Sequence, residues 1–567
     1  MRFNNNNRYL FKQTFLLIIV SFFSFFSAFA QKATDTIYDL DVVNIIQSYE
    51  PILINSDKVP LLPDVPKFSK NKPDAQTYQF SDVKGKINYS AEDIRPIKMS
   101  LPQPDKQKFL YLKAGFGNYL TPLLNLSLVN PNQSKFRAGL NTDFIFSKAK
   151  KTKFQQYFDF KVKGFGEYFI KSSALVGASI NTQFDQYHFY ANQDSNITRK
   201  DIANMYKRFG ANIYLKNIAD KDFDYQANIG FNNTSNTLNQ KETTIQIDLK
   251  GHYMFMQNIG AGANILVNNV GYKDAIDSNK TNRFSMGINP YAIVQYKIWK
   301  LKLGANVMGT NKKLYVLPSI QNVLNIYKNY LTMYNEWNSQ VKVNSLHKNS
   351  LENAFIDANN FRNQIDEKRT FIGLRGAASG FYYDLNFSQL VSRNALLYAY
   401  NEYDNTYDAA ISPRIGTFQP EYIHKIKALN PHIALGYAKG NKYGAKLSFD
   451  YYIYNKNNDF EVIYKPKLQS KLSVFYNWNE KLFIDLSMTA YGKMNGLVHQ
   501  VSNDVIVNTY LQPIKGVVDI NLSASYFFTK NIGVFLDLTN ISHQKYQHYI
   551  NYPSYGVQVI GGVKIAY

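Results

Sequence analysis

The residues of this 567-residue chain that are chemically capable of catalysis or metal binding are eight histidines, scattered carboxylates and many lysines. No pair of histidines has the helical spacing of a zinc site with a neighbouring glutamate, and no Gly-x-Ser-x-Gly motif places a nucleophile. His543 and His548 lie in a stretch rich in Tyr and Lys, where we expect solvated side chains. The chain contains no cysteine, which excludes disulfides, thiolate metal sites and cysteine nucleophiles. We therefore expect no catalysis, no cofactor and no metal site.

One stretch is rich in oxygen ligands: it contains Asn401, Glu402, Asp404, Asn405 and Asp408. A hard cation such as Ca²⁺ takes six to eight oxygen ligands, so a calcium site in this loop is chemically possible. The stretch has no glycine for the sharp turn of a calcium loop and no glutamate spaced to bind in a bidentate manner. We expect a solvated loop here.

The remaining chemistry lies in charged residues that alternate with apolar ones along extended segments. Seven of them are candidates for lining an internal passage: Arg137, Lys446, Asp450, Asp485, Asp519, Asp537 and Lys564. Their signs are mixed. Such charges line an aqueous path in a wide barrel, or they pair across it to hold another segment in place, and the sequence leaves both alternatives open.

These charges are positioned by strands with a period of two. In Tyr555–Tyr567 the odd positions are mostly apolar or aromatic, and the even positions are small or polar. Residues 518–528 and 532–538 form the clearest hairpin, with one apolar face and one face of Asp, Asn and Ser. Successive side chains of a strand point to opposite faces. A chain that ends in such a strand needs a sheet that closes on itself. The pattern predicts an all-β, antiparallel, up-and-down transmembrane barrel over 108–567 with its apolar face toward lipid.

The breaks between the predicted strands are of two kinds. Ten tight turns are expected near Asn132, Ser172, Ala219, Asn258, Trp299, Asn329, Gly380, Gly440, Glu480 and Lys530. Between them lie eleven other breaks, at Gly117-Asn118 and Thr310-Asn311 and at 147–155, 192–203, 233–240, 273–280, 343–366, 393–425, 455–465, 494–513 and 542–554. These 21 connections predict 22 strands. Bacterial barrels have short periplasmic turns and long external loops, so both termini are expected in the periplasm.

Two details within the strands require a decision. Ala174–Tyr190 keeps a single alternation phase and is predicted to be one long strand. Pro290 and Pro318 lie inside predicted strands of a sheet without edges. Since proline cannot donate to the ladder, we expect β-bulges there, and the strand number is least secure at these two positions.

The chain before the barrel has two parts. Residues 1–30 have a basic start, a short apolar run and an Ala-Phe-Ala site before Gln31, which predicts a cleaved secretory signal. Residues 31–107 contain eight of the 18 prolines and are predicted to form an extended periplasmic arm. The arm is expected either to contact a periplasmic partner or to enter the barrel.

The net charge is +22, and the lysines are spread evenly along the chain. This spacing favours solvated loops and an aqueous lumen over a nucleic-acid interface. An exported barrel meets outer-membrane lipid and lipopolysaccharide, and we expect no nucleic-acid partner. The terminal segment, Tyr555–Tyr567, is the expected contact with the barrel assembly machinery.

Several segments resemble TonB-dependent outer-membrane receptors of the Bacteroidetes type. The residues that carry the resemblance are Leu538-Thr539-Asn540-Ile541, Lys545-Tyr546, Tyr552-Pro553, Gly561-Gly562 and the terminal Tyr567. Leu112–Tyr119, near the start of the barrel, resembles the first hairpin of plugless, receptor-like barrels from Bacteroidetes. The resemblance covers 108–567 and implies a barrel of 22 strands in the outer membrane of a Gram-negative bacterium. It specifies no ligand.

The chain departs from that family before the barrel. The receptors carry a plug domain of well over a hundred residues, whereas 77 residues separate Gln31 from Lys108 here. Two functions remain. One is a receptor or transport barrel that binds or moves a ligand, with the arm as a partial plug. The other is a non-transporting scaffold or accessory barrel of an envelope assembly.

Overall fold

The computed structural model describes residues 108–130, 135–150, 152–170, 173–191, 198–218, 222–274, 280–310, 313–357, 361–403, 415–455, 462–502 and 505–567. The predicted signal and arm (1–107) lie outside these residues, and so do Asp404, Asn405 and Asp408 of the oxygen-rich stretch. Among the residues that the structure describes, no helix combines the length and the apolar character that crossing a membrane requires.

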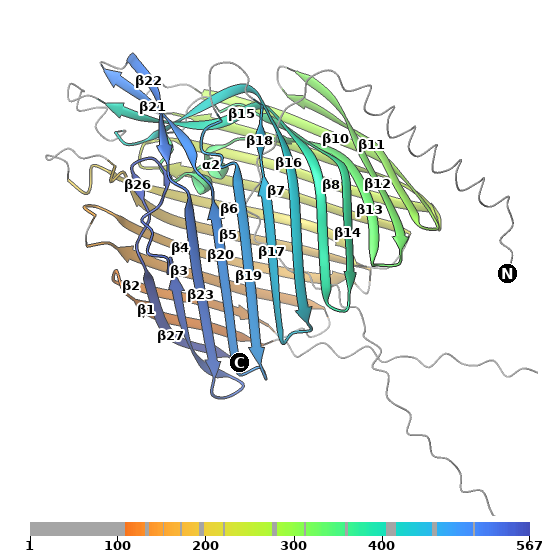
Figure 1. Cartoon of the computed structure of the whole chain (residues 1–567), viewed down its shortest axis with the longest axis horizontal. Helices are drawn as coiled ribbons and strands as arrows, with labels where there is room; N and C mark the ends of the chain where they lie inside the picture. Colours follow the sequence, from red (N-terminus) through yellow and green to blue (C-terminus); the bar gives the residue numbers. More distant parts are fainter. Residues whose placement is uncertain are drawn as a thin grey trace, which may run out of the picture. The chain divides into compact units, whose positions relative to one another are not determined.

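The described residues form one closed antiparallel barrel of 22 strands (Figure 1). Its wall consists of β1 (Leu110–Gly117), β2 (Thr121–Val129), β3 (Phe136–Lys148), β4 (Gln156–Ile170), β5 (Ala174–His188), β6 (Ala203–Asn217), β7 (Phe223–Asn236), β8 (Lys241–Met256), β9 (Ile259–Lys273), β10 (Lys280–Tyr296), β11 (Trp299–Thr310), β12 (Leu314–Tyr327), β13 (Leu331–Lys342), β14 (Gln364–Ala378), β15 (Phe381–Tyr403), β16 (Phe418–Lys439), β17 (Tyr443–Tyr451), β19 (Leu468–Trp478), β20 (Leu482–Tyr491), β23 (Val517–Phe527), β24 (Ile532–Thr539) and β27 (Gln558–Ala566). The predicted fold class and strand number are confirmed.

Smaller elements lie outside the wall. They are the helix α2 (Leu346–Glu352), the short strand β18 (Ile453–Tyr454) beyond β17, the hairpin β21 (Met494–Ser502) and β22 (Val505–Ile514), and the hairpin β25 (Gln547–Tyr549) and β26 (Tyr552–Pro553). The helix α2 and the two hairpins lie in connections that the sequence predicts as long breaks, whereas β18 lies just before the break predicted at 455–465.

The C-terminal strand closes the barrel. β27 pairs with β24 on one side and with β1 on the other. Backbone hydrogen bonds of 3.0 and 2.8 Å join Leu110 and Tyr567 in both directions. Each of the ten predicted tight turns falls between consecutive wall strands at this same end, which we name the turn end. The opposite end carries the long connections and is named the loop end.

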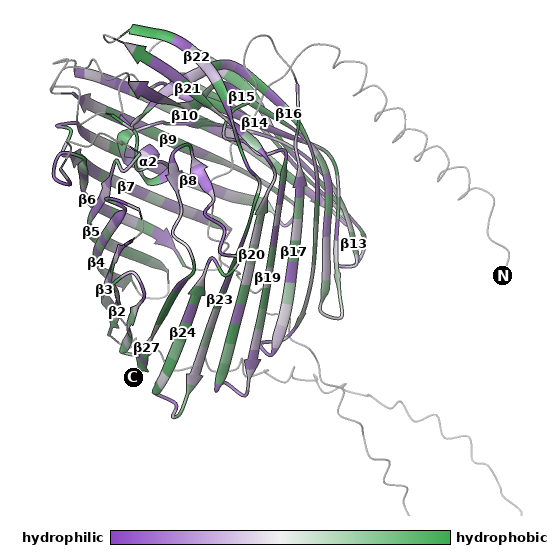
Figure 2. Ribbon diagram, turned by 60° about the vertical axis from the view of Figure 1, so that its left-hand side comes forward, coloured by the Kyte–Doolittle hydropathy of each residue, from purple (hydrophilic) through white to green (hydrophobic). Residues whose placement is uncertain are grey.

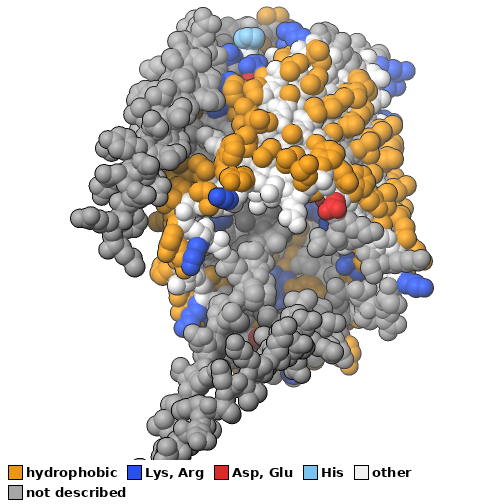
Figure 3. Space-filling model, turned by 90° about the vertical axis from the view of Figure 1, so that its right-hand side faces the viewer, with side chains coloured by type: hydrophobic (Ala, Val, Ile, Leu, Met, Phe, Trp, Pro, Cys, Tyr) orange, Lys and Arg blue, Asp and Glu red, His pale blue; other side chains and the backbone are white. Residues whose placement is uncertain are grey.

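The outer face of the wall is apolar, as the alternation predicts. Hydrophobic and hydrophilic residues alternate along the wall strands (Figure 2), and hydrophobic side chains cover much of the face of the barrel seen in Figure 3. On β27, Val563 is 44% exposed on this face, while its neighbour Lys564 points inward and bonds Ser525. Exposed aromatic residues adjoin the tight turns: Phe255, Tyr296, Tyr327, Phe381 and Phe528. They form an aromatic girdle at the turn end, the position in which such rings meet a membrane–water interface.

The prediction of one long strand from Ala174 is confirmed, and the prediction of β-bulges at Pro290 and Pro318 is wrong. Ala174–His188 is a single strand, β5, paired without a shift with β4 and β6. No register shift occurs at Pro290 or Pro318. The ladder is instead interrupted on one side of each proline, because Pro290 pairs only toward β9 and Pro318 only toward β11. Losing one donor is accommodated without an extra residue.

Two of the predicted loops contain strands in the structure, so they were predicted too long. The break at 393–425 is largely strand, because β15 runs to Tyr403 and β16 starts at Phe418. The break at 494–513 is the hairpin β21–β22, and β21 pairs in parallel with the end of β15. Alternation fails in both places for a physical reason. Residues 395–400 of β15 are buried on both faces, and most of β22 is exposed on both faces.

Candidate functional site: the lumen and its cap

The seven predicted lumen residues all lie on wall strands, and three of them come together at the closing seam. Lys113 on β1 forms an ion pair of 2.5 Å with Asp537, which also accepts a hydrogen bond of 2.6 Å from Ser523. Lys564 donates to Ser525 at 2.5 Å. Asp485 on β20 opposes Ser523 in the ladder. The seam therefore carries a network of alternating charge across β20, β23, β24, β27 and β1.

The other four candidates are dispersed. Arg137 on β3 pairs with Glu167 on β4, which also accepts a hydrogen bond from Tyr214 at 2.6 Å. Asp450 pairs with His432 at 2.8 Å, and Lys446 lies on the same face of β17 as Asp450. Asp519 accepts a bond of 3.1 Å from Asn521. These residues belong to the inner wall and do not converge on one centre.

A polar cavity of about 400 Å³ lies against the inner wall of β8–β13. Its charged residues are Asp248, Lys250, Lys302 and Glu336, two of each sign, and amide side chains fill much of the rest of its lining. Such a wall suits water and hydrated polar solutes, because amides both donate and accept hydrogen bonds.

The most unexpected feature is the connection between β13 and β14, which folds back against the inner wall of the barrel. Its helix α2 starts at the N-cap Ser345, whose hydroxyl accepts from the Lys348 N–H at 3.2 Å. The carboxylate of Glu242, on β8, accepts from the N–H groups of Leu346 at 2.6 Å and His347 at 3.0 Å. A negative charge at a helix N-terminus satisfies otherwise unpaired donors and opposes the helix dipole favourably.

Three further wall strands hold this connection. On β6, Arg208 donates to Ser350 of α2 at 2.8 Å and forms a buried ion pair with Asp185 of β5. On β7, Thr234 bonds the His347 ring at 2.9 Å. On β10, Arg283 donates to the Asn344 carbonyl at 2.7 Å. Burial, with the cations Arg208 and Lys348, lowers the pKa of His347 to about 4.

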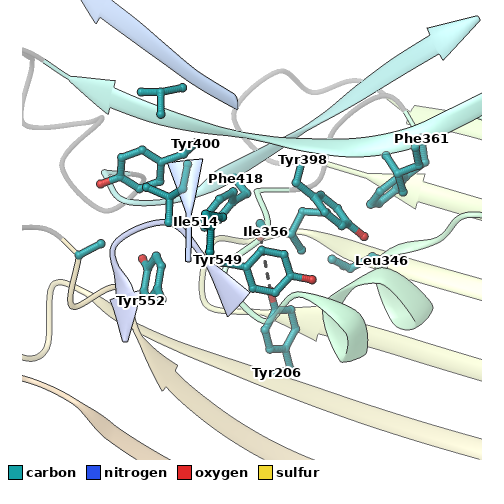
Figure 4. Packing of buried hydrophobic residues seen from close by; sticks show 14 of the residues in the cluster. Tyr206, Leu346, Ile356, Phe361, Tyr398, Tyr400, Phe418, Ile514, Tyr549 and Tyr552 are labelled. Carbon is teal, nitrogen blue, oxygen red and sulfur yellow. Dashed lines mark hydrogen bonds between the residues drawn. The ribbon is translucent and has the colours of Figure 1, made fainter. Parts of the chain in front are cut away.

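An aromatic core joins this connection to segments from the other side of the barrel (Figure 4). It contains Tyr206 of β6, Tyr398 of β15, Phe418 of β16 and Tyr549 and Tyr552 of the β25–β26 hairpin. Tyr206 donates to the Ala354 carbonyl at 3.1 Å, and Tyr549 donates to the Glu352 carbonyl at 3.1 Å. Phe355 stacks on Tyr552 with ring centroids 3.6 Å apart. Burial raises the pKa of both Tyr549 and Tyr552 well above the ordinary value.

We name this assembly the cap. It consists of residues 343–357 and 361–363, the loop-end parts of β15 (from Ala395) and β16 (to Ile423), the hairpin β21–β22 and the hairpin β25–β26. A barrel of 22 strands is too wide for side chains of opposite walls to meet. Yet Tyr206 and Tyr398 belong to one packed core, because the cap bridges the loop-end mouth.

Sequence reasoning missed the cap. The signal was present as large apolar side chains within predicted loops, including Leu346, Phe355, Ile356, Tyr549 and Ile550, which are not typical of solvated loops. Their partners lie on distant strands, so one sequence does not reveal them.

The other candidates from the sequence are the oxygen-rich stretch and the two histidines near the C-terminus. Asn401 is buried at the end of β15, and Glu402 accepts hydrogen bonds from Tyr510 at 3.0 Å and Gln500 at 3.2 Å. His543 is exposed, as expected, whereas the ring of His548 packs edge-to-face against Tyr549 with centroids 4.8 Å apart. Within the described residues, no group of three or more His, Asp or Glu side chains is placed to hold a metal ion.

The comparisons with known proteins agree with the fold. No protein-family model matches the chain, and neither does any curated protein. Among solved structures, the FrpB iron transporter from Neisseria meningitidis (F3-3 variant) aligns with a TM-score of 0.62 at 12% identity, covering 82% of each chain.

A mutant of the ferric enterobactin receptor PfeA from Pseudomonas aeruginosa aligns with a TM-score of 0.60 at 9% identity, over 81% of this chain and 80% of that one. The siderophore receptor PirA from Acinetobacter baumannii gives 0.60 at 10% identity with the same coverage. The chain therefore has the fold of TonB-dependent outer-membrane receptor barrels, which confirms the predicted resemblance.

Proposed function

We propose that this protein is an outer-membrane receptor or transport barrel that takes a ligand at its loop end and passes it through the lumen. The observation that carries the proposal is the closed 22-strand barrel with a folded cap anchored across its loop-end mouth. A barrel of this width has an interior that its own side chains do not fill. A cap with its own aromatic core controls what enters that interior.

The structurally similar proteins support a receptor or transporter function over an enzymatic one, since they include an iron transporter and a ferric enterobactin receptor. Their identity of about one residue in ten supports no transfer of ligand. The mixed charges of the lumen, with Arg137, Lys446, Asp450, Asp485, Asp519, Asp537 and Lys564 as candidates, are proposed to contact a hydrated solute along its path.

The proposed cellular location rests on the apolar outer face of the barrel. The apolar outer face and the aromatic girdle match a bilayer, and the barrel, with its predicted signal (1–30), is proposed to lie in the outer membrane. The turn end, which carries Lys108 and Tyr567, is proposed to face the periplasm. Lipid and lipopolysaccharide then surround the wall, and the arm (31–107) is available to a periplasmic partner or to the lumen.

One observation favours the scaffold alternative. Among the described strands, β22 pairs only with β21, and Val505, Ile506 and Val507 on it are 61%, 50% and 63% exposed. An open apolar strand edge invites pairing with another chain. A barrel that serves as an accessory of an envelope assembly would use such an edge.

Deletion of residues 31–100, with the signal retained, separates the two functions. A transport barrel with its arm as a partial plug gains conductance in planar bilayers when the arm is removed. If conductance stays the same and the deletion abolishes co-purification of another envelope protein, the scaffold function replaces the proposed one.

A further inference from the structure

A second cavity lies at the loop end, between the ends of β4 and β5, Phe355 of the cap, and residues 546–555 around β25–β26. Its volume is about 230 Å³. Eight of its 14 lining residues are Tyr or Phe, and none is Lys, Arg, Asp or Glu. The walls therefore offer aromatic surface and little formal charge.

Most of the seven tyrosines of this lining already donate their phenol hydrogens to the protein. Five tyrosines donate to protein acceptors: Tyr157 to Asp159 at 3.0 Å, Tyr190 to the Pro553 carbonyl at 3.0 Å, Tyr549 to the Glu352 carbonyl at 3.1 Å, Tyr555 to the Ser147 carbonyl at 3.3 Å, and Tyr552 to the Gly416 carbonyl. The Gln155 amide donates to the same Pro553 carbonyl at 2.8 Å. An anion or another acceptor-rich ligand thus finds few donors here.

One hydrogen-bond acceptor of the lining, in contrast, has no partner within the protein that is described. Gln156 is 7% exposed and lines the cavity, and its side-chain oxygen has no hydrogen-bond partner among the described residues. A buried acceptor without a partner costs free energy, which a ligand that donates an N–H bond recovers. The cavity is therefore matched to a ligand that supplies donors or positive charge.

Aromatic faces provide the rest of the recognition. The ring quadrupole places negative potential over each face, so a cation enclosed by several rings is attracted from several sides. Tyr190, Phe355 and Tyr552 pack at edge-to-face or stacked angles with centroids 3.6–5.9 Å apart, which fixes the rings before a ligand enters. Asp159, a carboxylate behind the wall that Tyr157 contacts, is paired with Lys161 at 2.8 Å, so the rings and Gln156 carry the selectivity.

We propose that this aromatic cavity is a binding site for a small organic cation of the ammonium class. The rings hold the cationic centre and its apolar substituents, and the Gln156 oxygen accepts an N–H bond where the ligand has one. The site lies where the cap meets the loop ends of β4 and β5, and the proposal stands whether or not the barrel transports its ligand.

Calorimetry on the full-length protein in detergent tests the charge selectivity. The probes are tetramethylammonium and tert-butanol, which are similar in size and differ in charge. We expect tetramethylammonium to bind at least tenfold more tightly. Equal affinities would show an apolar pocket without cation selectivity, and tighter binding of benzoate than of tetramethylammonium would reverse the assigned class. Either result overturns the proposal.

Variants test the location and the role of Gln156. Tyr190→Leu should weaken tetramethylammonium about tenfold, whereas Tyr327→Leu, on the outer face near the turn end, should not. Gln156→Leu should weaken methylammonium and leave tetramethylammonium, which has no N–H, unchanged. If Tyr190→Leu behaves like Tyr327→Leu, the site is elsewhere.

A measurement on the unaltered protein covers the case in which a variant fails to fold. The methyl protons of bound tetramethylammonium should show nuclear Overhauser contacts to tyrosine ring protons. Binding without such contacts would contradict an aromatic cavity.

Discussion

The anchoring of the cap by Glu242 predicts that Glu242→Gln releases the connection between β13 and β14 without unfolding the barrel. The carboxylate accepts two backbone N–H groups of α2, at 2.6 and 3.0 Å, and it faces Arg283. Hydrogen bonds to a charged group contribute about 1.5–3 kcal/mol each, and a neutral one about 1. Glutamine keeps one acceptor oxygen and loses the charge, so with the lower of these values docking of α2 should weaken by about 2–3 kcal/mol.

That loss corresponds to an increase of roughly 30- to 150-fold in the population of the released state, at 1.4 kcal/mol for each factor of ten. Lys348 lies in α2 and is exposed, but a helical bond is cleaved only after local opening. When opening is fast relative to cleavage, the rate of proteolysis follows the equilibrium population of the open state. The rate of tryptic cleavage after Lys348, followed by mass spectrometry, should rise by that factor.

The matched control is Glu336→Gln, which makes the same chemical change on the inner wall of β13, in the polar cavity. Its cleavage rate after Lys348 should equal that of the unaltered protein, and both variants should keep the heat-modifiable mobility of a folded barrel. If Glu242→Gln is cleaved at the rate of Glu336→Gln, the anchor contributes nothing measurable, and the account of the cap is wrong.

Three further predictions concern orientation, the lipid face and pH. A cysteine replacing Val505 should react with an impermeant maleimide on intact cells and one replacing Lys530 should not; the reverse labelling would invert the barrel. Val563→Arg should reduce the amount of folded barrel far more than Lys564→Gln, because a charge on the lipid face costs about 2–4 kcal/mol near midplane, and equal amounts would contradict the assigned faces. His347 has a folded-state pKa of about 4, below that of the free side chain, so its contribution to docking is full above about pH 6.5 and is lost as pH falls toward 4. Hydrogen-exchange protection of the cap amides should drop on the order of tenfold between pH 7 and 5, and an unchanged drop in His347→Asn would assign the effect to another group.

The barrel could be predicted from the sequence because its main determinant is local. Wherever one face meets lipid and the other meets water, side chains alternate, as in Phe223–Phe231 or in the hairpin that turns at Lys530. The asymmetry between tight turns and long breaks then gives the strand number and the two ends. The same alternation identifies the inward-facing positions, such as Asp537 and Lys564.

The features that could not be predicted from the sequence depend on contacts between distant segments. The ion pair of Lys113 with Asp537 joins residues 424 positions apart, and it follows only from closure of the barrel. Beyond Arg393, β15 is covered on both faces by the cap, so the alternation that identifies a strand disappears. The helix α2 owes its position to Glu242 and Arg208, which are separated from it by more than a hundred residues.

The central claim is that the cap closes the loop-end mouth of a barrel built for passage. Its most direct test is the conductance, in planar bilayers, of a variant in which residues 344–357 are replaced by a short Gly-Ser linker. We expect the unaltered protein to conduct weakly and the variant, still heat-modifiable, to form large and stable channels. A folded variant whose conductance equals that of the unaltered protein would contradict the claim.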